Sequence, residues 1–201
     1  MKVWDLKLQK KYIRNLIKLF NLKNIPNFLT ILRIVLIPSI IICIELGNEK
    51  YYWIALFLYV TACFSDFFDG YLARKFDIES NFGRFLDPIA DKVLVVSVLI
   101  ILIANNLISG AFVYPALVII LREIIVSGLR DFFLHSTKTL LVTNLAKWKT
   151  LIQMSSLGFL IVQNNFETKL ILFFGNLGLT FASVITLYTG YIYFKKNLKL
   201  F

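Results

Sequence analysis

The sequence predicts an all-α integral membrane protein with six transmembrane helices, preceded by an amphipathic helix at the membrane interface. Of its 201 residues, 58% are hydrophobic and only 17% are charged, whereas soluble domains usually carry about 25% charged residues. A soluble core of this size could not bury so much apolar surface, so a lipid bilayer is the expected solvent. The length allows one compact helical domain.

Six segments are candidates for membrane spans, each of which needs about 20 mostly apolar residues. They lie near Phe28–Leu46, Tyr51–Gly70, Ile89–Leu107, Ala111–Leu129, Thr150–Gln163 and Leu170–Phe194. The fifth has a short apolar run and must borrow polar residues from one end. The start of the third is ambiguous, because Pro88 could occupy its first turn or kink a longer helix.

Lysine and arginine residues alternate between the two sides of these spans. They gather before the first span, between the second and third, between the fourth and fifth, and after the sixth. The opposite connections hold only Lys50 and Lys169. The basic excess marks the cytoplasmic side, so six spans would place both termini in the cytoplasm, with the chain in the cell membrane. The net charge of +10 suits an anionic lipid surface, and no nucleic-acid recognition pattern is present.

Residues 1–23 form a basic amphipathic segment ahead of a six-helix domain over residues 24–201. Between residues 4 and 20, apolar side chains alternate with lysines at roughly helical spacing. An interfacial helix on an anionic leaflet fits this pattern. A plain basic anchor that only sets the topology fits it equally well.

Four aspartates lie where the second span meets the third. Asp66 and Asp69 are three apart, and Asp87 and Asp91 are four apart, so each pair shares one helix face. Ionised carboxylates are costly to desolvate at a membrane boundary, and four together repel one another. If the two faces pack together, the hard oxygen donors suit Mg²⁺ or Mn²⁺, and two ions could clamp a phosphoryl group. The alternative is a set of interfacial charges that are solvated or paired with nearby basic residues.

The aspartates belong to the longer pattern Asp-x₂-Asp-Gly-x₂-Ala-Arg-x₈-Gly-x₃-Asp-x₃-Asp, which resembles the signature of the CDP-alcohol phosphatidyltransferase family. The matching residues are Asp66, Asp69, Gly70, Ala73, Arg74, Gly83, Asp87 and Asp91. The resemblance implies a six-helix membrane fold, usually a homodimer, with a dinuclear metal site open to the cytoplasm. It also implies transfer from a CDP-linked lipid with release of CMP. On this basis the first six of these residues are expected to contact the CDP group.

Other stretches extend the resemblance. Asn24–Arg33 is similar to the family's N-terminal element, in which Asn27 and Thr30 are candidates for nucleotide contact. The stretches Arg122–Arg130 and Ala146–Thr150 resemble segments of one bacterial branch, the phosphatidylglycerophosphate synthases. That branch implies CDP-diacylglycerol as donor and glycerol 3-phosphate as acceptor.

Basic residues on neighbouring spans are candidates for binding the acceptor phosphate, since guanidinium and ammonium groups bind phosphate oxygens. They are Arg122, Arg130, Lys147 and Lys149. The resemblance implies that Asp91 takes the proton of the acceptor hydroxyl. For Arg122 the competing interpretation is an ion pair with Glu123 that only fixes packing. For Lys147 and Lys149 the competing interpretation is that they are ordinary basic residues on the cytoplasmic side of the membrane.

Three other functions stay open at this point. The same chemistry could use serine, inositol phosphate or phosphatidylglycerol as acceptor. Intramembrane prenyltransferases also use aspartate-rich motifs with Mg²⁺. The Ala73-Arg74 element argues against this class, and so does the single window of 26 residues that holds all four aspartates. A small cation transporter would need carboxylates near the middle of the membrane, not at its cytoplasmic edge.

Overall fold

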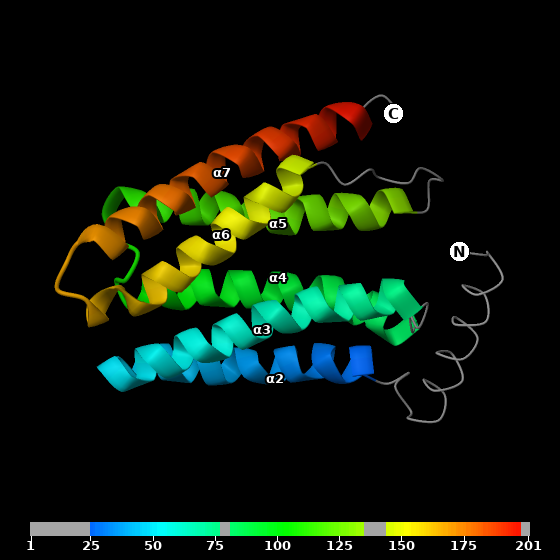
Figure 1. Ribbon diagram of the computed structural model, residues 1–201. Helices are drawn as coiled ribbons and strands as arrows, with labels where there is room; N and C mark the ends of the chain where they lie inside the picture. Colours follow the sequence, from blue (N-terminus) through cyan, green and yellow to red (C-terminus); the bar gives the residue numbers. More distant parts are fainter. Residues whose placement is uncertain (1–24, 77–80, 135–143, 198–201) are drawn as a thin grey trace, which may run out of the picture.

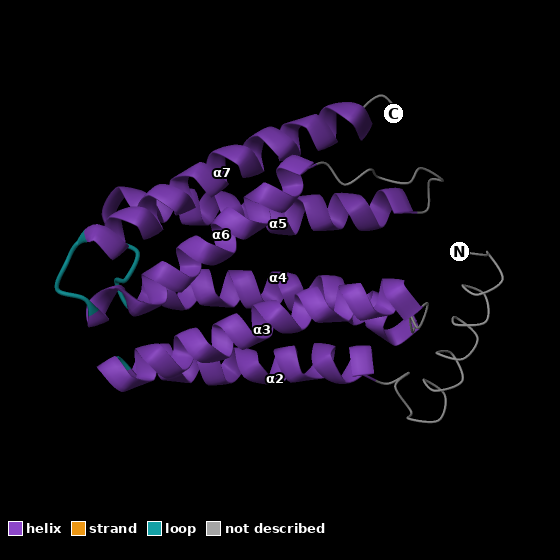
Figure 2. Cartoon of the chain, viewed as in Figure 1, coloured by secondary structure: helices purple, strands orange, loops and turns teal. Residues whose placement is uncertain are grey.

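The computed structural model describes residues 25–76, 81–134 and 144–197. This part is helical, with loops and no strand (Figure 2). Its helices are α2 (Ile25–Leu46), α3 (Glu49–Phe76), α4 (Asn81–Ala104), α5 (Val113–Leu134), α6 (Asn144–Val162) and α7 (Leu170–Asn197), with 3₁₀ turns η2 (Gly110–Phe112) and η3 (Gln163–Asn165). The amphipathic segment expected over residues 1–23 lies outside the described residues.

Each of the six predicted segments corresponds to one helix, and each helix extends beyond its predicted segment at one end or both. Helix α3 continues to Phe76, and α4 begins at Asn81 rather than at Ile89. The apolar run predicts the length that can contact lipid, whereas helix ends depend on backbone hydrogen bonds, which polar residues also permit. Pro88 therefore lies inside α4, where it removes one hydrogen bond from the helix.

The helices run back and forth between two ends of the bundle (Figure 1). At one end α2, α4 and α6 begin and α3, α5 and α7 finish. We call this the basic end, because the lysine- and arginine-rich stretches of the sequence adjoin these helix ends. At the opposite end, the described connections hold only Lys50 and Lys169 as basic residues. The order of helices thus agrees with the alternation of charge along the chain.

Within the part of the chain that the structure describes, three helices are long and apolar enough to cross a membrane. Their apolar segments are Phe28–Leu46, Gly110–Gly128 and Leu170–Ile192, with mean hydropathies of 2.3, 1.8 and 2.0. At most a third of each segment is buried within the bundle. Large apolar side chains face outward: Phe57 is 71% exposed and Tyr114 72%. An apolar outer surface of this extent is typical of lipid contact, so the chain is a membrane protein.

The core lies along the axis of the bundle and draws on every helix. Ile40, Tyr59, Leu99, Ile119 and Leu160, one from each of α2 to α6, are at most 2% exposed. On α7, Leu179 and Ala182 are also fully buried.

Helices α6 and α7 approach closely because α7 lacks side chains where they meet. A Cβ atom at Gly175 would lie 2.9 Å from the Leu160 Cγ atom, and one at Gly178 would overlap the Ser156 hydroxyl. Small residues allow such close contact between helices in membranes. The packing sets the position of α6, which carries two residues of the site described next.

Candidate active site

The two buried charged side chains of the described part, Arg33 and Lys149, lie toward the basic end of the bundle. Thr30 and Arg33 on α2, Ser65 on α3 and Lys149 on α6 are all at most 6% exposed, and each lies in the half of its helix nearer that end. Gln153, at the middle of α6, is 3% exposed. Burying polar groups costs free energy unless they are paired or bind a ligand, so this concentration indicates a functional region.

The four aspartates lie at matching depths on α3 and α4. Helix α3 runs toward the basic end, and α4 runs away from it (Figure 1). Asp66 precedes the end of α3 by 10 residues, and Asp91 follows the start of α4 by 10, about 15 Å along each helix. Asp69 and Asp87 are 7 and 6 residues from the same ends. The backbone therefore allows the convergence that the sequence predicts. The side chains of Asp66 and Asp69 lie outside the described part, so convergence itself stays a prediction.

The two aspartates of α4 face different neighbours. The Asp87 Oδ1 atom accepts a hydrogen bond of 2.5 Å from the Thr30 hydroxyl, which is completely buried. Asp91 lines a polar cavity. A candidate nucleotide contact and a candidate metal ligand are thus joined directly. Carboxylate oxygens fit a hard cation such as Mg²⁺ or Mn²⁺, although the described side chains include no group of three potential ligands.

The polar cavity lies between α4, α5 and α6 and has a volume of about 200 Å³. Its polar lining consists mainly of Asp91, Lys92, Arg122, Glu123, Lys149 and Gln153. At about 30 Å³ per water molecule, it has room for roughly six waters. That is the size of a small polar solute, not of a lipid.

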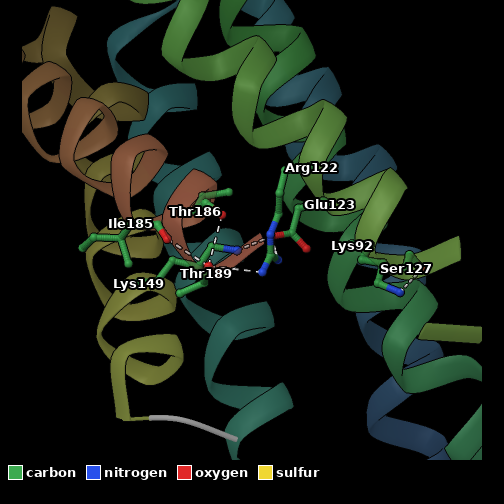
Figure 3. Close-up of polar contacts among 8 residues, drawn as sticks. All are labelled: Lys92, Arg122, Glu123, Ser127, Lys149, Ile185, Thr186 and Thr189. Carbon is green, nitrogen blue, oxygen red and sulfur yellow. Dashed lines mark hydrogen bonds and ion pairs between the residues drawn. The ribbon is translucent and has the colours of Figure 1, made fainter. Parts of the chain in front are cut away.

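One carboxylate, Glu123, holds two of the cavity's cations (Figure 3). It accepts hydrogen bonds from the Lys149 Nζ atom of α6 and, at 3.3 Å, from the Arg122 Nη1 atom. The Arg122 Nη2 atom also donates to the Thr189 hydroxyl of α7, at 3.3 Å. We call Arg122, Glu123, Lys149 and Thr189 the Glu123 cluster. It fastens three helices together beside the cavity.

The charges around the cavity favour an anion. Three cations, from Lys92, Arg122 and Lys149, face the two carboxylates of Asp91 and Glu123, so one positive charge is left over when all are ionised. The side chain of Lys149 is only 8% exposed and that of Arg122 is 19% exposed. Charges this buried are held by partners. Lys149 is therefore not an ordinary lysine on the membrane surface. The ion pair of Arg122 with Glu123, the competing interpretation for Arg122, is present within a larger cluster.

Several predicted residues cannot be compared with this geometry. The side chains or surroundings of Asn27, Gly70, Ala73, Arg74, Gly83, Arg130 and Lys147 lie outside the described part of the structure. Their backbones fall in α2 to α6 as expected. Their roles stay predictions.

The structure also places residues for which the sequence predicted no role. Arg33 is completely buried in α2, one turn after Thr30. An arginine inside an apolar span is itself a signal of function, and this signal was present in the sequence. Gln153 and Thr189 carried no comparable signal, because a lone amide or hydroxyl in a membrane helix often only packs against its neighbours.

A larger, mostly apolar groove lies near the opposite end of the bundle. It has a volume of about 550 Å³ and is lined by Phe112, by Lys169 and by one face of α7 that includes Asn176 and Phe181. Its lining has no carboxylate or other proton acceptor suited to catalysis. The smaller polar cavity is the better candidate for an active site.

Comparison with known proteins identifies relatives over most of the chain. The family model for CDP-alcohol phosphatidyltransferases matches residues 23–189, which include the four aspartates and the whole Glu123 cluster. A protein of Rickettsia felis named CDP-diacylglycerol–glycerol-3-phosphate 3-phosphatidyltransferase is 41% identical over 180 residues, covering 89% of this chain and 98% of its own. A protein of the same name from Bacillus subtilis is 36% identical over 187 residues, with coverages of 87% and 95%.

Proposed function

Because the chain belongs to the CDP-alcohol phosphatidyltransferase family, we propose that it transfers the phosphatidyl group of CDP-diacylglycerol to glycerol 3-phosphate. The products are phosphatidylglycerophosphate and CMP, and the reaction belongs to phospholipid biosynthesis. Support comes from the similar proteins that carry this activity in their names. The observation that carries the proposal is the small cavity in which Asp91 lies beside buried cations.

The acceptor's phosphate binds at Arg122 and Lys149. Both are anchored by Glu123, so the site is preorganised and loses little side-chain entropy when the phosphate arrives. A guanidinium can bind two phosphate oxygens at once. Arg130 and Lys147 lie farther toward the basic end of the same helices and extend the site in that direction.

Asp91 acts as the general base. It removes the proton from the terminal hydroxyl of glycerol 3-phosphate, and that oxygen attacks the phosphorus that carries the diacylglycerol group. A new phosphorus–oxygen bond forms while the bond to CMP breaks, and CMP leaves as the phosphate anion. Asp91, Arg122 and Lys149 line one cavity of about 200 Å³, which supports contact of one small acceptor with all three.

The four aspartates, Asp66, Asp69, Asp87 and Asp91, would hold two divalent ions, Mg²⁺ or Mn²⁺. Such ions, when bound, neutralise the diphosphate of the donor and polarise the phosphorus under attack. The hydrogen bond from Thr30 orients Asp87 for this role. Thr30, with Asn27 and the residues Gly70, Ala73, Arg74 and Gly83, surrounds the CDP group.

The bundle crosses the membrane six times, and both termini and the active site face the cytoplasm. Two copies form a homodimer. The depth of Asp66 and Asp91, about 15 Å from the nearer helix ends, suits a donor whose head group enters from the cytoplasm while its acyl chains stay in lipid. The basic end attracts the anionic leaflet and both anionic substrates.

The test measures CMP release by the purified protein in detergent, with CDP-diacylglycerol and Mg²⁺ or Mn²⁺. Glycerol 3-phosphate, serine and inositol phosphate are offered in separate reactions. We expect release only with glycerol 3-phosphate, and loss of release with a chelator. Release with another acceptor would overturn the role of Arg122 and Lys149. No metal-dependent release from folded protein would overturn the proposed reaction.

Two variants complete the same experiment. Asp91→Asn keeps the shape of the side chain but cannot accept the proton, so turnover should fall to background while the thermal unfolding in detergent is unchanged. Glu45→Gln changes an exposed carboxylate at the opposite end of the bundle and should keep full turnover. Activity retained in Asp91→Asn would remove Asp91 from the role of base.

A further inference from the structure

Gln153 carries a side-chain amide that is buried in α6. It lies on α6 one turn after Lys149, is 3% exposed and lines the polar cavity. Among the residues that the structure describes, its Oε1 atom has no hydrogen-bond donor. A buried acceptor without a donor costs about 1–3 kcal/mol of stability. A group of this kind calls for a specific explanation, and a ligand in the cavity is the one that the geometry favours.

Two neighbouring ammonium groups are hydrogen-bonded to residues other than Gln153. Lys92 donates to the Ser127 hydroxyl, and Lys149 donates to Glu123. The Met154 sulfur and backbone oxygen, next in sequence, accept from the Tyr59 hydroxyl at 3.2 Å. The Gln153 amide is therefore left facing the cavity between the Glu123 cluster and the surface of α4 that carries Asp91.

Glycerol 3-phosphate has three polar parts, and two of them already have partners in the cavity. Its phosphate binds Arg122 and Lys149, and its terminal hydroxyl reaches Asp91. Its middle hydroxyl lies between these two groups and can both donate and accept a hydrogen bond. A glutamine amide offers one acceptor and two donors without a net charge, so it matches a hydroxyl and would not compete for the phosphate.

We propose that Gln153 binds the middle hydroxyl of the acceptor and thereby selects a glycerol phosphate over a phosphorylated alcohol that lacks this hydroxyl. The inference rests on the proposed function and adds a specificity-determining residue to it. When the site is filled, the hydroxyl satisfies the buried amide. When an acceptor lacks the hydroxyl, the amide stays buried and unsatisfied, which is why such sites discriminate well.

The test compares two acceptors on the unaltered protein and on Gln153→Met, in which an apolar side chain of similar length replaces the amide. The acceptors are glycerol 3-phosphate and 3-hydroxypropyl phosphate, which differ only in the middle hydroxyl. We expect the unaltered protein to favour glycerol 3-phosphate at least tenfold in kcat/KM, the effect of about one buried hydrogen bond. In Gln153→Met, kcat/KM should fall about tenfold for glycerol 3-phosphate and stay within twofold for the analogue.

Gln163→Met is the matched control. Gln163 is also a buried glutamine, but it lies at the opposite end of the bundle and donates to the Leu107 carbonyl at 2.6 Å. This variant should keep the selectivity of the unaltered protein. Gln153→Leu repeats the test if the methionine variant does not accumulate as folded protein.

Three results would overturn the inference: equal use of both acceptors by the unaltered protein, selectivity retained in the Gln153 variants, or an equal loss for both acceptors in those variants. The last result would mean that Gln153 only supports the cavity. A failure of the proposed function would look different, because the unaltered protein would then release no CMP with glycerol 3-phosphate.

Discussion

Glu123 determines how the buried cations of the cavity are arranged. Its carboxylate is only 16% exposed and contacts both Arg122 and Lys149. Without it, two like charges would face each other in a poorly hydrated site. Buried ion pairs contribute little net stability, but removal of one partner leaves a charge uncompensated. The residue thus holds in place the two groups proposed to bind the acceptor's phosphate.

We predict that Glu123→Gln lowers the stability of the protein by about 3 kcal/mol, the usual cost of breaking a buried ion pair. Thermal unfolding in detergent measures the loss. Added inorganic phosphate should recover part of it, since an oxyanion can bind the two cations in place of the carboxylate and a ligand stabilises the folded state.

Glu45→Gln is the control for this change. Glu45 is exposed and accepts a hydrogen bond of 3.0 Å from Asn105 at the opposite end of the bundle, so its substitution should change stability by less than about 0.5 kcal/mol. If the unfolding temperature of Glu123→Gln equals that of the unaltered protein, the carboxylate does not hold the cations together.

At the scale of the helices, the contact between α6 and α7 positions the acceptor site. Helix α6 carries Lys149 and Gln153, and α7 carries Thr189, which binds Arg122. A further glycine, Gly190, lies against the Arg122 side chain, where an added Cβ atom would come within 3.4 Å of Cγ. Because these glycines of α7 carry no side chain, helix α6 and the Arg122 side chain can both lie close to α7.

We predict that Gly175→Ala destabilises the protein by about 1–3 kcal/mol, the usual effect of overpacking a core. Its new methyl group would lie 2.9 Å from two atoms of Leu160, which is completely buried and has no room to move. Thermal unfolding of the purified protein in detergent measures the change.

Gly128→Ala is the matched control, because it makes the same substitution inside α5 where an added Cβ atom would meet nothing within 4 Å. Alanine is favoured over glycine in helices by about 1 kcal/mol, so this variant should be as stable as the unaltered protein or more so. Equal unfolding temperatures for both variants would show that α6 and α7 are not closely packed at Gly175.

At the scale of the molecule, the six described helices alternate in direction. The halves of the helices that carry the candidate site therefore lie together, toward the basic end. The helices contain 19 to 28 residues, about 28–42 Å in length, and the hydrocarbon core of a bilayer is about 30 Å thick. The basic residues favour the cytoplasmic side. All the groups proposed for catalysis then lie where CDP, CMP and glycerol 3-phosphate are soluble.

We predict that single cysteines at the two ends of the bundle are labelled from opposite sides of the membrane. In a chain with Cys43 and Cys63 changed to alanine, Ser109→Cys should react with an impermeant maleimide added outside spheroplasts. Lys195→Cys, at the basic end of α7, should react only after the membrane is permeabilised. Labelling of both from the same side would contradict six spans.

The sequence by itself predicted the helical membrane fold, the family and the spacing of the four aspartates on consecutive helices. These features depend on local information. Apolar length predicts a span, the alternation of basic residues predicts which helix ends lie together, and the fixed spacing of Asp66, Asp69, Asp87 and Asp91 predicts two faces on consecutive helices. Consecutive helices in a bundle are neighbours, so little tertiary information was needed.

Only the tertiary structure decided which partners the buried polar side chains have. Lys149 meets Glu123 across 26 positions, and Arg122 meets Thr189 across 67. From the sequence alone, Arg122 and Glu123 also fit a simple ion pair of neighbouring residues, and Lys149 also fits an ordinary lysine at the membrane surface. Helix rotation and close packing at glycines determine which face of each helix is buried, and these depend on all the neighbouring helices at once. For that reason the polar cavity and the buried Gln153 amide that lines it were found from the fold and not from the spacing of residues.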